Sequence, residues 1–469
     1  MGNRMKQADE KKLYTKSLFI FRRDLRLHDN TALIAALGAS HTVILCFIFD
    51  PRQVDATNKY RSNNALQFMV ESLQDLEQQC AQVKAKLFYF YGQAHEVVQK
   101  IIASQHVEAL ICNNDYTPFS IMRDTLITGV CNQNGVAFHS YDDALLTNPK
   151  EILTKKGTPF AKFTAFYNTA SKLSVESPIR LPVGDFHNQI IADSHTLSSL
   201  QKTVAPTLNK QMYVHGGTLQ AEKHLKQIGL QKKYVQTHDM PAQSTSNLSA
   251  YLKFGCISIR HVYHSIKTQL DQAHPLIRQL YWRDFFTYIA FHSPHIFGHS
   301  FQPKYDQLPW SYNAKHFNAW CTGTTGFPIV DAGMRQLNTT GYMHNRVRMI
   351  VASFLTKDLH INWLDGERYF AQQLVDYDPA INNGNWQWCA STGCDAQPYF
   401  RIFNPWLQQK KFDPECVYIK QWVPELEALD PKTIHSWYTT QSPHLPKYPK
   451  PIVDHSQESA LTKKLLRAV

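Results

Sequence analysis

The sequence predicts two regions of different fold class: a doubly wound, parallel-sheet α/β domain at the N-terminal end and an all-α C-terminal part, joined by a long connector. Apolar runs of strand length alternate with helical segments as far as about residue 145, whereas the pattern after residue 211 is mostly helical. All nine tryptophans lie after residue 280. This uneven distribution indicates that the two parts of the chain perform different tasks.

Five short runs of apolar, β-branched or aromatic residues predict the strands of the N-terminal domain. Between two of them, residues 65–82 carry apolar side chains at spacings of three and four, which is typical of an amphipathic helix. Strands that alternate with such helices favour a parallel sheet, and we expect this domain over 17–145, after a polar extension over 1–16. The predicted strands occupy residues 17–21, 41–50, 86–91, 109–112 and 136–139.

The loop after the first predicted strand, residues 22–30, is rich in arginine and aspartate. A dinucleotide-binding fold would place glycines here, because only glycine lets the backbone approach a pyrophosphate closely. Two interpretations remain open. Either a nucleotide binds in a different manner, or an arginine and aspartate cluster ties the loop to a neighbouring domain, which is the interpretation we favour.

The connector is expected over 146–210, where five prolines and many small polar residues interrupt any regular period. Its apolar patches indicate that it packs against the domains rather than extending into solvent. The helical domain is then expected over 211–469.

Two helices of this domain present faces of mixed polar and apolar character. One begins at Pro275, because proline suits the first turn of a helix, and the other covers about 345–359. Either face alone is more often a packing edge than a binding site. The residues that share these faces are 279, 282, 283 and 286 on the first helix, and Asn345, Arg348 and Met349 on the second.

Two further segments carry more chemistry than local structure requires. Residues 376–388 combine two aspartates, an Asn-Asn-Gly sequence predicted as a turn, and two tryptophans, which favours a planar ligand or a redox role. Residues 245–249 form a hydroxyl-rich cluster before an apolar run. Such a cluster at a helix start suits a phosphate, although a simple N-cap explains it equally well.

Composition narrows the possible functions. The formal net charge of +11 and a pI near 9.0 suggest a polyanionic partner, but a basic balance is also common among proteins that bind no nucleic acid. The nine cysteines form no C-x-x-C pair, and the zincin, Walker and dinucleotide fingerprints are absent, so no metal site is expected. No apolar run reaches membrane-spanning length, and we expect a cytoplasmic protein without membrane contact.

Six motifs occurring in order resemble the photolyase/cryptochrome flavoprotein family, most closely the class I photolyases that split cyclobutane pyrimidine dimers. The resemblance runs from about residue 18 to residue 425, and it is specific because the motifs agree in order and spacing. The motifs are FRRDLRLHDN (21–30), TSNLS (245–249), YWRDF (281–285), HNRVRMI (344–350), NNGNWQW (382–388) and ASTGCDAQPYFRIFNP (390–405).

The resemblance implies an N-terminal antenna domain and a C-terminal helical domain that holds FAD, active in its reduced form. It places Asn382 opposite flavin N5, where a neutral amide favours electron-rich states of the ring. Arg348 and Asp376 match an ion pair beside the isoalloxazine. The implied FAD contacts are Tyr234, Thr245, Ser246, Leu248, Ser249, Arg283, Arg348, Asp376, Asp378 and Asn382.

The resemblance also implies a substrate, UV-damaged DNA that contains pyrimidine dimers. A flipped-out dimer needs flat apolar walls and a few edge hydrogen bonds, and its flanking phosphates need basic residues. A chain of tryptophans would relay electrons to the flavin from the surface. The implied lesion contacts are Gln279, Trp282, Asn345, Met349, Trp388 and Arg401, and the implied relay is Trp386, Trp363 and Trp310.

Two positions depart from the pattern of dimer photolyases. Gln279 stands where those enzymes usually have glutamate, and (6-4) photolyases tend to have glutamine, so (6-4) repair remains a minor alternative. Ser120 stands where folate-binding members usually have glutamate, which argues against methenyltetrahydrofolate and leaves a deazaflavin, another chromophore or none as the antenna.

A light-sensing cryptochrome is the main competing function, and a flavin electron carrier that binds no DNA is a third. Only 44 residues follow residue 425, whereas a signalling tail is more often long and disordered. We therefore predict a dimer-splitting repair enzyme, acting as a monomer.

Overall fold

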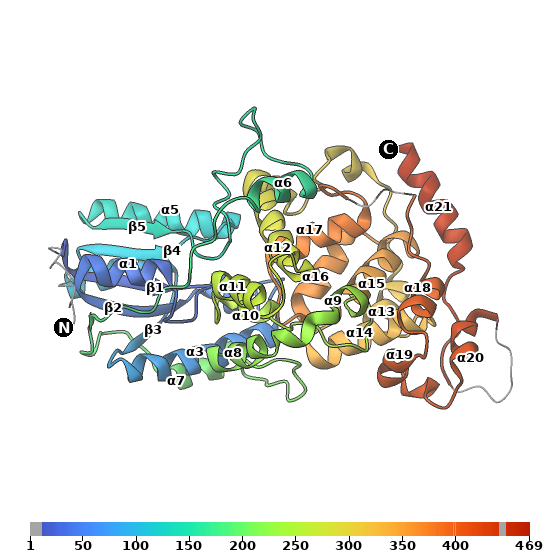
Figure 1. Cartoon of the computed structure of the whole chain (residues 1–469), viewed down its shortest axis with the longest axis horizontal. Helices are drawn as coiled ribbons and strands as arrows, with labels where there is room; N and C mark the ends of the chain where they lie inside the picture. The colour runs from blue at the N-terminus through green and yellow to red at the C-terminus, as the bar shows by residue number, and fades with distance from the viewer. Residues whose placement is uncertain (1–11, 397, 399, 440–446) are drawn as a thin grey trace.

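The computed structural model describes residues 12–396, 398, 400–439 and 447–469. A sheet flanked by helices forms one end of the molecule, and a larger helical body forms the other (Figure 1). Of the predicted polar extension over 1–16, residues 1–11 lie outside the described part of the chain. The first strand begins at Tyr14, three residues before the predicted start of this domain.

The sheet is parallel, with strand order β3-β2-β1-β4-β5. This confirms the predicted fold class, and it places a topological switch between β1 and β4, where parallel sheets open a crevice at their carboxyl ends. One short strand from the connector, β6, pairs with β2 and was not predicted because it has two residues. The strands are β1 Tyr14–Phe21, β2 Ser40–Phe49, β3 Leu87–Tyr91, β4 Ala109–Asn113, β5 Ala137–Tyr141 and β6 Asp185–Phe186.

Helices cover both faces of the sheet, as doubly wound folds require. Alternate β1 side chains point to opposite faces: Phe19 packs in one core with residues of α1 and α3, and Leu18 packs in another with residues of α4 and α5. Figure 1 shows these layers edge-on. The helices of this region are α1 Thr31–Ala39, α2 Pro51–Val54, α3 Asn63–Gln82, α4 Ala94–Gln105 and α5 Pro118–Gln133.

The connector is less irregular than its composition predicted. It contains two helices, α6 Phe163–Ala170 and α7 Leu197–Val204, and both bury apolar residues. The remaining helices form the C-terminal body: α8 Thr218–Lys226, α9 Tyr234–Thr237, α10 Ser249–Phe254, α11 Ile259–Gln269, α12 Pro275–His292, α13 Ala314–Thr322, α14 Pro328–Thr340, α15 Asn345–Lys357, α16 Trp363–Gln373, α17 Pro379–Ala390, α18 Pro405–Phe412, α19 Val417–Trp422, α20 Pro431–His435 and α21 His455–Ala468.

The Asn-Asn-Gly sequence was predicted as a turn, and this prediction is wrong. These residues lie inside α17, which begins with Asp378 as N-cap and Pro379 in the first turn. Gly384 has a packing role in the helix, since a Cβ there would lie 2.2 Å from the Phe286 ring of α12. Close helix contact, rather than a turn, therefore explains the glycine.

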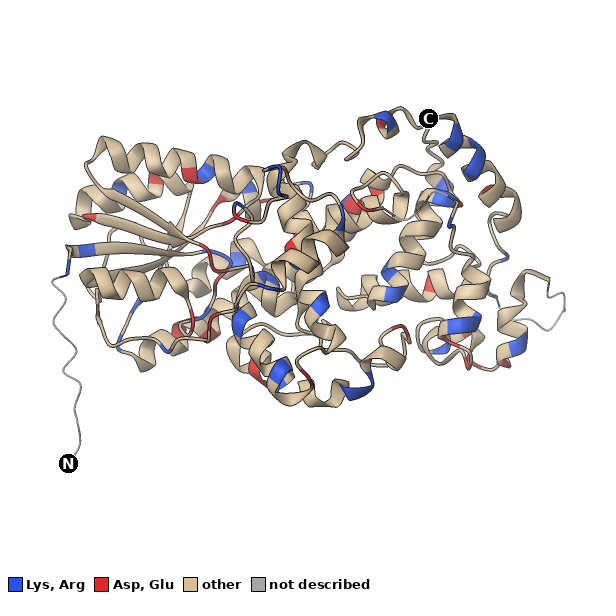
Figure 2. Ribbon diagram, turned by 45° about the horizontal axis from the view of Figure 1, so that its top comes forward, with Lys and Arg blue, Asp and Glu red and all other residues tan. Residues whose placement is uncertain are grey.

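The arginine and aspartate loop joins the two regions, which confirms the interpretation that we favoured. The Leu25 amide donates to the Phe254 carbonyl at 3.0 Å, and Arg260 of α11 pairs with Asp29 at 2.9 Å. Gly255 permits the contact, because its φ is +65° and a Cβ would lie 2.1 Å from the Arg23 carbonyl oxygen. Figure 2 shows basic and acidic residues gathered where the strand ends meet the helical body.

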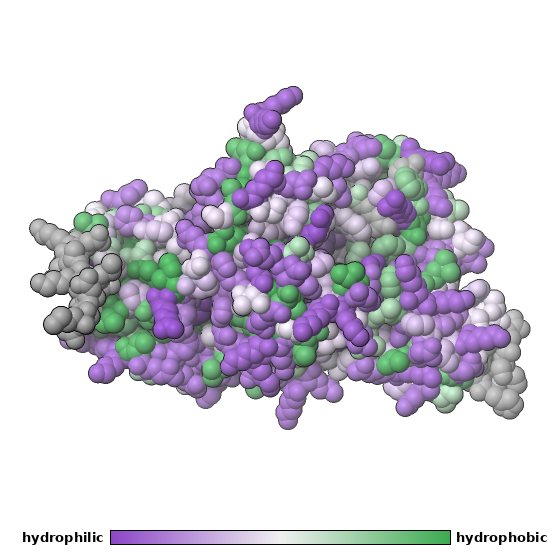
Figure 3. Space-filling model, viewed as in Figure 1, coloured by the Kyte–Doolittle hydropathy of each residue, from purple (hydrophilic) through white to green (hydrophobic). Residues whose placement is uncertain are grey.

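The face drawn in Figure 3 is mostly hydrophilic, with apolar residues in small scattered groups. Among the described residues, no helix has both the length and the apolar character needed to cross a membrane.

Candidate functional site

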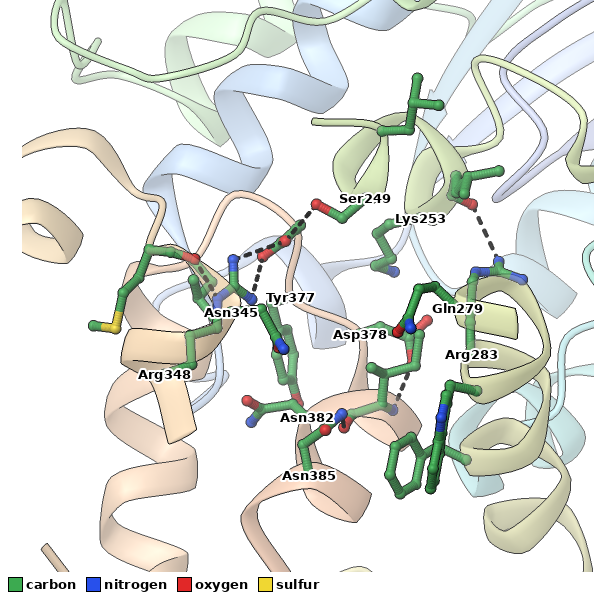
Figure 4. Close-up of a pocket in the computed structure, with 18 of the residues that line it drawn as sticks. Ser249, Lys253, Gln279, Arg283, Asn345, Arg348, Tyr377, Asp378, Asn382 and Asn385 are labelled. Carbon is green, nitrogen blue, oxygen red and sulfur yellow. Dashed lines mark hydrogen bonds and ion pairs between the residues drawn. The ribbon is translucent and has the colours of Figure 1, made fainter. Parts of the chain in front are cut away.

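A cavity of about 480 Å³ opens in the helical body between α10, α12, α15 and α17. Figure 4 shows Gln279 and Arg283 on one side of it, Asn345 and Arg348 on the other, and Asn382 and Asn385 between them. Most of the predicted site residues meet here although they come from four separate segments of the chain. Those lining the cavity are Ser246, Leu248, Ser249, Gln279, Trp282, Arg283, Asn345, Arg348, Met349, Asp376, Asp378, Asn382, Trp386 and Trp388.

Five predicted residues do not line this cavity. Tyr234 begins α9 and is buried, with its ring 5.9 Å from that of His274. Thr245 immediately precedes the lining residue Ser246. Trp363 is buried in the core behind the cavity, Trp310 is half-buried at the edge of that core, and Arg401 is exposed.

The Arg348 and Asp376 pair has the predicted form. Both terminal nitrogens of Arg348 donate to the Asp376 carboxylate, at 3.1 and 3.0 Å, so the contact is bidentate. The Ser249 hydroxyl donates to the same carboxylate at 2.6 Å. A hydroxyl of the 245–249 cluster is therefore directed across the cavity, and the N-cap interpretation does not hold, because Leu248 occupies the cap position of α10 without a side-chain cap bond.

A second charged group surrounds Asp378. Burial alone would raise the pKa of this carboxyl, but Arg23, Lys253 and Arg283 outweigh burial and hold the pKa below its ordinary value. Arg23 reaches across from the sheet domain to bind Asp378, and Arg283 donates to the Ala144 carbonyl at 2.6 Å. Three cations thus face Asp378, although Arg23 also pairs with Asp115 at 3.1 Å and Arg283 lies 3.7 Å from Asp284. This cluster of basic groups suits a diphosphate or an electron-rich ring.

Lys253 is a lining residue that the sequence analysis missed. Burial, followed by repulsion from Arg23, lowers the pKa of its ammonium group to about 8. Figure 4 shows its amine turned into the cavity. A signal was available in the sequence, because residues four apart on a helix share a face and Lys253 follows Ser249 by four.

Asn382 is oriented by its neighbours. Its amide nitrogen donates to the Glu367 carbonyl oxygen at 3.1 Å, so its amide oxygen is turned away from that carbonyl and toward the cavity. The Glu367 side chain accepts from Asn383 at 3.2 Å, and burial raises the pKa of its carboxyl to about 7. A neutral acceptor is thus held at the cavity wall, as a reduced flavin N5–H would need.

The predicted lesion residues lie on facing walls. Trp282 and Gln279 come from α12, Asn345 and Met349 from α15, and Trp388 from α17. The Asn345 amide lies 3.9 Å from the Met349 sulfur. The two indoles are only partly buried and both line the cavity, so part of their flat apolar surface remains open to it.

Trp386 forms the floor between this cavity and the aromatic core behind it. Its ring centroid lies 4.9 Å from that of Phe370 and 6.1 Å from that of Trp320. Gly366 allows α16 to approach, because a Cβ there would lie 2.2 Å from the Trp386 ring. The sequence analysis did not single out Trp320, since its spacing in the chain does not reveal that it contacts Trp386.

A second cavity, of about 590 Å³, opens at the carboxyl ends of the strands. Phe47, Arg52, Tyr60 and Phe119 line it together with Ser120, the only one of these that the sequence analysis had considered. Lys253 and Tyr377 line both cavities, so the two spaces share a wall.

Comparison with known proteins identifies the family. A family model described as the FAD binding domain of DNA photolyase matches residues 276–468, and one described as DNA photolyase matches 17–183. A deoxyribodipyrimidine photo-lyase of Vibrio cholerae is 36% identical, over 95% of this chain and 98% of its own. The chain belongs to the DNA photolyase family. This confirms the resemblance, while the predicted domain boundaries stay predictions.

Two solved structures extend the comparison. An archaeal photolyase from Sulfolobus tokodaii is 44% identical, with a TM-score of 0.88 over 97% of this chain and 100% of its own. It contains two FAD molecules, described as implicating a novel light-harvesting cofactor. A cryptochrome from Synechocystis is 27% identical, with a TM-score of 0.87 over 97% of this chain and 99% of its own.

Proposed function

We propose that this chain is a light-driven DNA repair enzyme that splits cyclobutane pyrimidine dimers. One observation carries the proposal: two tryptophans from the packed helices α12 and α17, Trp282 and Trp388, line the same cavity as Asn382 and the Arg348 and Asp376 pair. A cofactor site and a flat-walled site for bases are thus one continuous space. A flavin electron carrier that binds no DNA would not need the flat-walled site for bases.

The residues of the cavity fit FAD. The cations around Asp378 and the hydroxyls of Ser246 and Ser249 suit its phosphates and ribityl chain, and Arg348 places positive charge where an electron-rich ring would lie. Asn382 offers a neutral acceptor to the ring. When bound and reduced, FAD supplies the light-excited electron that opens the cyclobutane ring. The protein itself orients the cofactor and the lesion, stabilises charge and excludes water.

The lesion is held by the opposite part of the cavity. Dimer rings would rest between the indoles of Trp282 and Trp388, and the Gln279 amide would donate to a base carbonyl without needing a raised pKa. Asn345 and Met349 complete the contacts. Arg401, which is exposed, and the net charge of +11 support salt-dependent contacts to flanking phosphates. The monomeric state and the cytoplasmic location belong to this proposal.

The second cavity supports an antenna. Its aromatic and arginine lining suits a planar anionic chromophore, and the archaeal relative with two FAD molecules adds a flavin to the deazaflavin and folate considered above. Chromophores released from purified protein by heat and separated by chromatography would identify it. A single chromophore, FAD at one per chain, would contradict the antenna.

Repair is tested directly with photoreduced protein and an oligothymidine that contains cyclobutane dimers. Blue light should restore the ultraviolet absorbance of intact thymine, and a sample kept in the dark should not change. Restoration only with an oligonucleotide carrying a (6-4) photoproduct would favour that alternative. No restoration with either substrate, from protein that retains FAD, would favour a light sensor.

A further inference from the structure

The first helix of the connector, α6, lies against the Trp282 wall of the cavity (Figure 1). The Phe163 ring stacks on the Trp282 indole with centroids 3.6 Å apart and planes only 7° from parallel. Phe163 is 1% exposed and does not line the cavity, whereas Trp282 does. One face of the indole is therefore covered by the connector.

The stacked pair is held by further contacts on the same side. The Arg278 guanidinium, one turn before Trp282 on α12, lies 4.9 Å from the Phe163 ring centroid and 4.8 Å from that of Tyr167. Tyr167 in turn stacks on Phe163 at 5.8 Å. These cation–π and ring contacts restrict how Phe163 can turn.

The start of α6 is also tied to the segment that follows Trp388. The Phe163 amide donates to the Asp395 carboxylate at 3.0 Å, and the Lys162 amine lies 3.4 Å from the same carboxylate. The Cys394 thiol donates to the Ala161 carbonyl at 3.0 Å. Residues 161–163 of the connector thus contact both the Trp282 indole and the segment that follows α17.

We propose that α6 is a positioning element of the lesion site and that Phe163 is the residue that fixes the plane of Trp282. The inference rests on the proposed function, because it gives Trp282 a base to stack on. An indole already held in one orientation loses no side-chain freedom when the base binds, so more of the stacking energy contributes to affinity. The connector would thereby act in recognition as well as in linking the domains.

Phe166 provides a matched control. It lies on the same helix, is equally buried, and contacts Phe285 and Tyr288 at 5.4 and 5.0 Å rather than Trp282. Phe163→Leu and Phe166→Leu therefore remove the same ring from the same helix at similar burial. Only the first removes the ring that lies flat against the indole at 3.6 Å, while Phe286, which stacks on the indole at 5.5 Å, remains in both variants.

The experiment measures binding of each FAD-loaded variant to an oligothymidine with and without one cyclobutane dimer. Phe163→Leu should weaken dimer binding about fivefold, the size expected when one side chain must be immobilised on binding. It should leave undamaged-strand binding unchanged, and Phe163→Tyr should restore dimer binding. Phe166→Leu should leave the preference for the dimer intact. Equal effects of the two leucine variants would overturn the proposal.

A second variant keeps the test decisive if Phe163→Leu does not fold. Asp395→Ala loosens the start of α6 while leaving every ring in place, and its loss of negative charge should not weaken binding of an undamaged strand. We expect a selective loss of dimer binding, and unaltered dimer binding would contradict the role of α6. A wild-type protein without any preference for the dimer would instead refute the proposed function itself.

Discussion

The cavity of the helical body and the cavity of the sheet domain have similar volumes, about 480 and 590 Å³, but they hold their charged side chains differently. In the first, Arg348 of α15 pairs with Asp376, 28 residues further along the chain. In the second, Arg52 is held by Asp50, two residues away. The first cavity therefore depends on pairing across the helical body, whereas the second combines this local pair with a longer-range pair between Arg23 and Asp115.

Arg23 links the two cavities. It donates to Asp115, which lines the second cavity, and binds Asp378, which lines the first. The comparison therefore predicts large, cooperative effects from substitutions in the helical body, and smaller effects from substitutions of second-cavity residues that take no part in this link. The following variants test this difference, in order of decreasing effect.

Arg348→Met should abolish retention of FAD and lower stability by about 3 kcal/mol, because it leaves the nearly buried Asp376 carboxylate without its cation. Flavin absorbance after gel filtration and thermal unfolding measure the two effects. Arg346→Met is the control, since Arg346 lies on the same helix but pairs with Asp239 and does not line the cavity. Similar flavin loss in both variants would mean that the pair has no special role.

Trp388→Ala should weaken dimer binding by roughly 1 to 3 kcal/mol, the range for one base stacked on an aromatic side chain. FAD content should stay at the wild-type level, because this indole lies on the lesion side. Binding to a fluorescent dimer-containing oligonucleotide measures the change. Unaltered affinity would mean that Trp388 only packs in the core and does not contact the lesion.

Trp386→Phe should strongly slow photoreduction of the oxidised protein but spare repair by protein that is reduced chemically beforehand. The indole is the first member of the predicted relay, and phenylalanine is much harder to oxidise. Trp320→Phe, at a ring in contact with Trp386, should leave photoreduction near the wild-type rate if the relay continues through Trp363. A larger effect at Trp320 would mean that the electron relay passes through Trp320 rather than Trp363.

FAD affinity should fall as pH rises through about 8, the pKa of the Lys253 ammonium. An anionic ligand binds the protonated amine better, so affinity is full below this pKa and is lost above it, by at most about tenfold per pH unit for one proton. Fluorescence titration of the apoprotein between pH 7 and pH 9 measures the slope. Lys253→Met should bind more weakly and without this slope, and an equal slope in the variant would point to another group.

Ala65→Trp, which places an indole in the second cavity, should have the smallest effect. We expect loss of any antenna chromophore, unchanged FAD content, and unchanged repair per photon absorbed by FAD itself. Action spectra of wild type and variant make the comparison. A fall in FAD content would show that a change in the second cavity also disturbs the first.

Much of the site could be predicted because its residues sit in short motifs whose spacing is fixed by helix geometry. Asn345, Arg348 and Met349 recur at three and four residues, so any helix brings them to one face. The contribution of Phe163 could not be assigned in the same way. Phe163 belongs to a segment whose prolines and polar residues predict irregular structure, and only its stacking on Trp282 shows its place in the site.

The sequence by itself determined the two fold classes, the parallel sheet and the helical faces, because apolar periodicity reports which side of each element is buried. The tertiary structure decided which elements meet: that Arg23 of the sheet domain reaches Asp378, that Gly384 packs inside a helix rather than forming a turn, and that the two cavities share a wall. The physical reason is the separation along the chain of the residues that interact. Periodicity is set by neighbours a few residues apart, whereas pairing and packing depend on contacts between residues hundreds of positions distant.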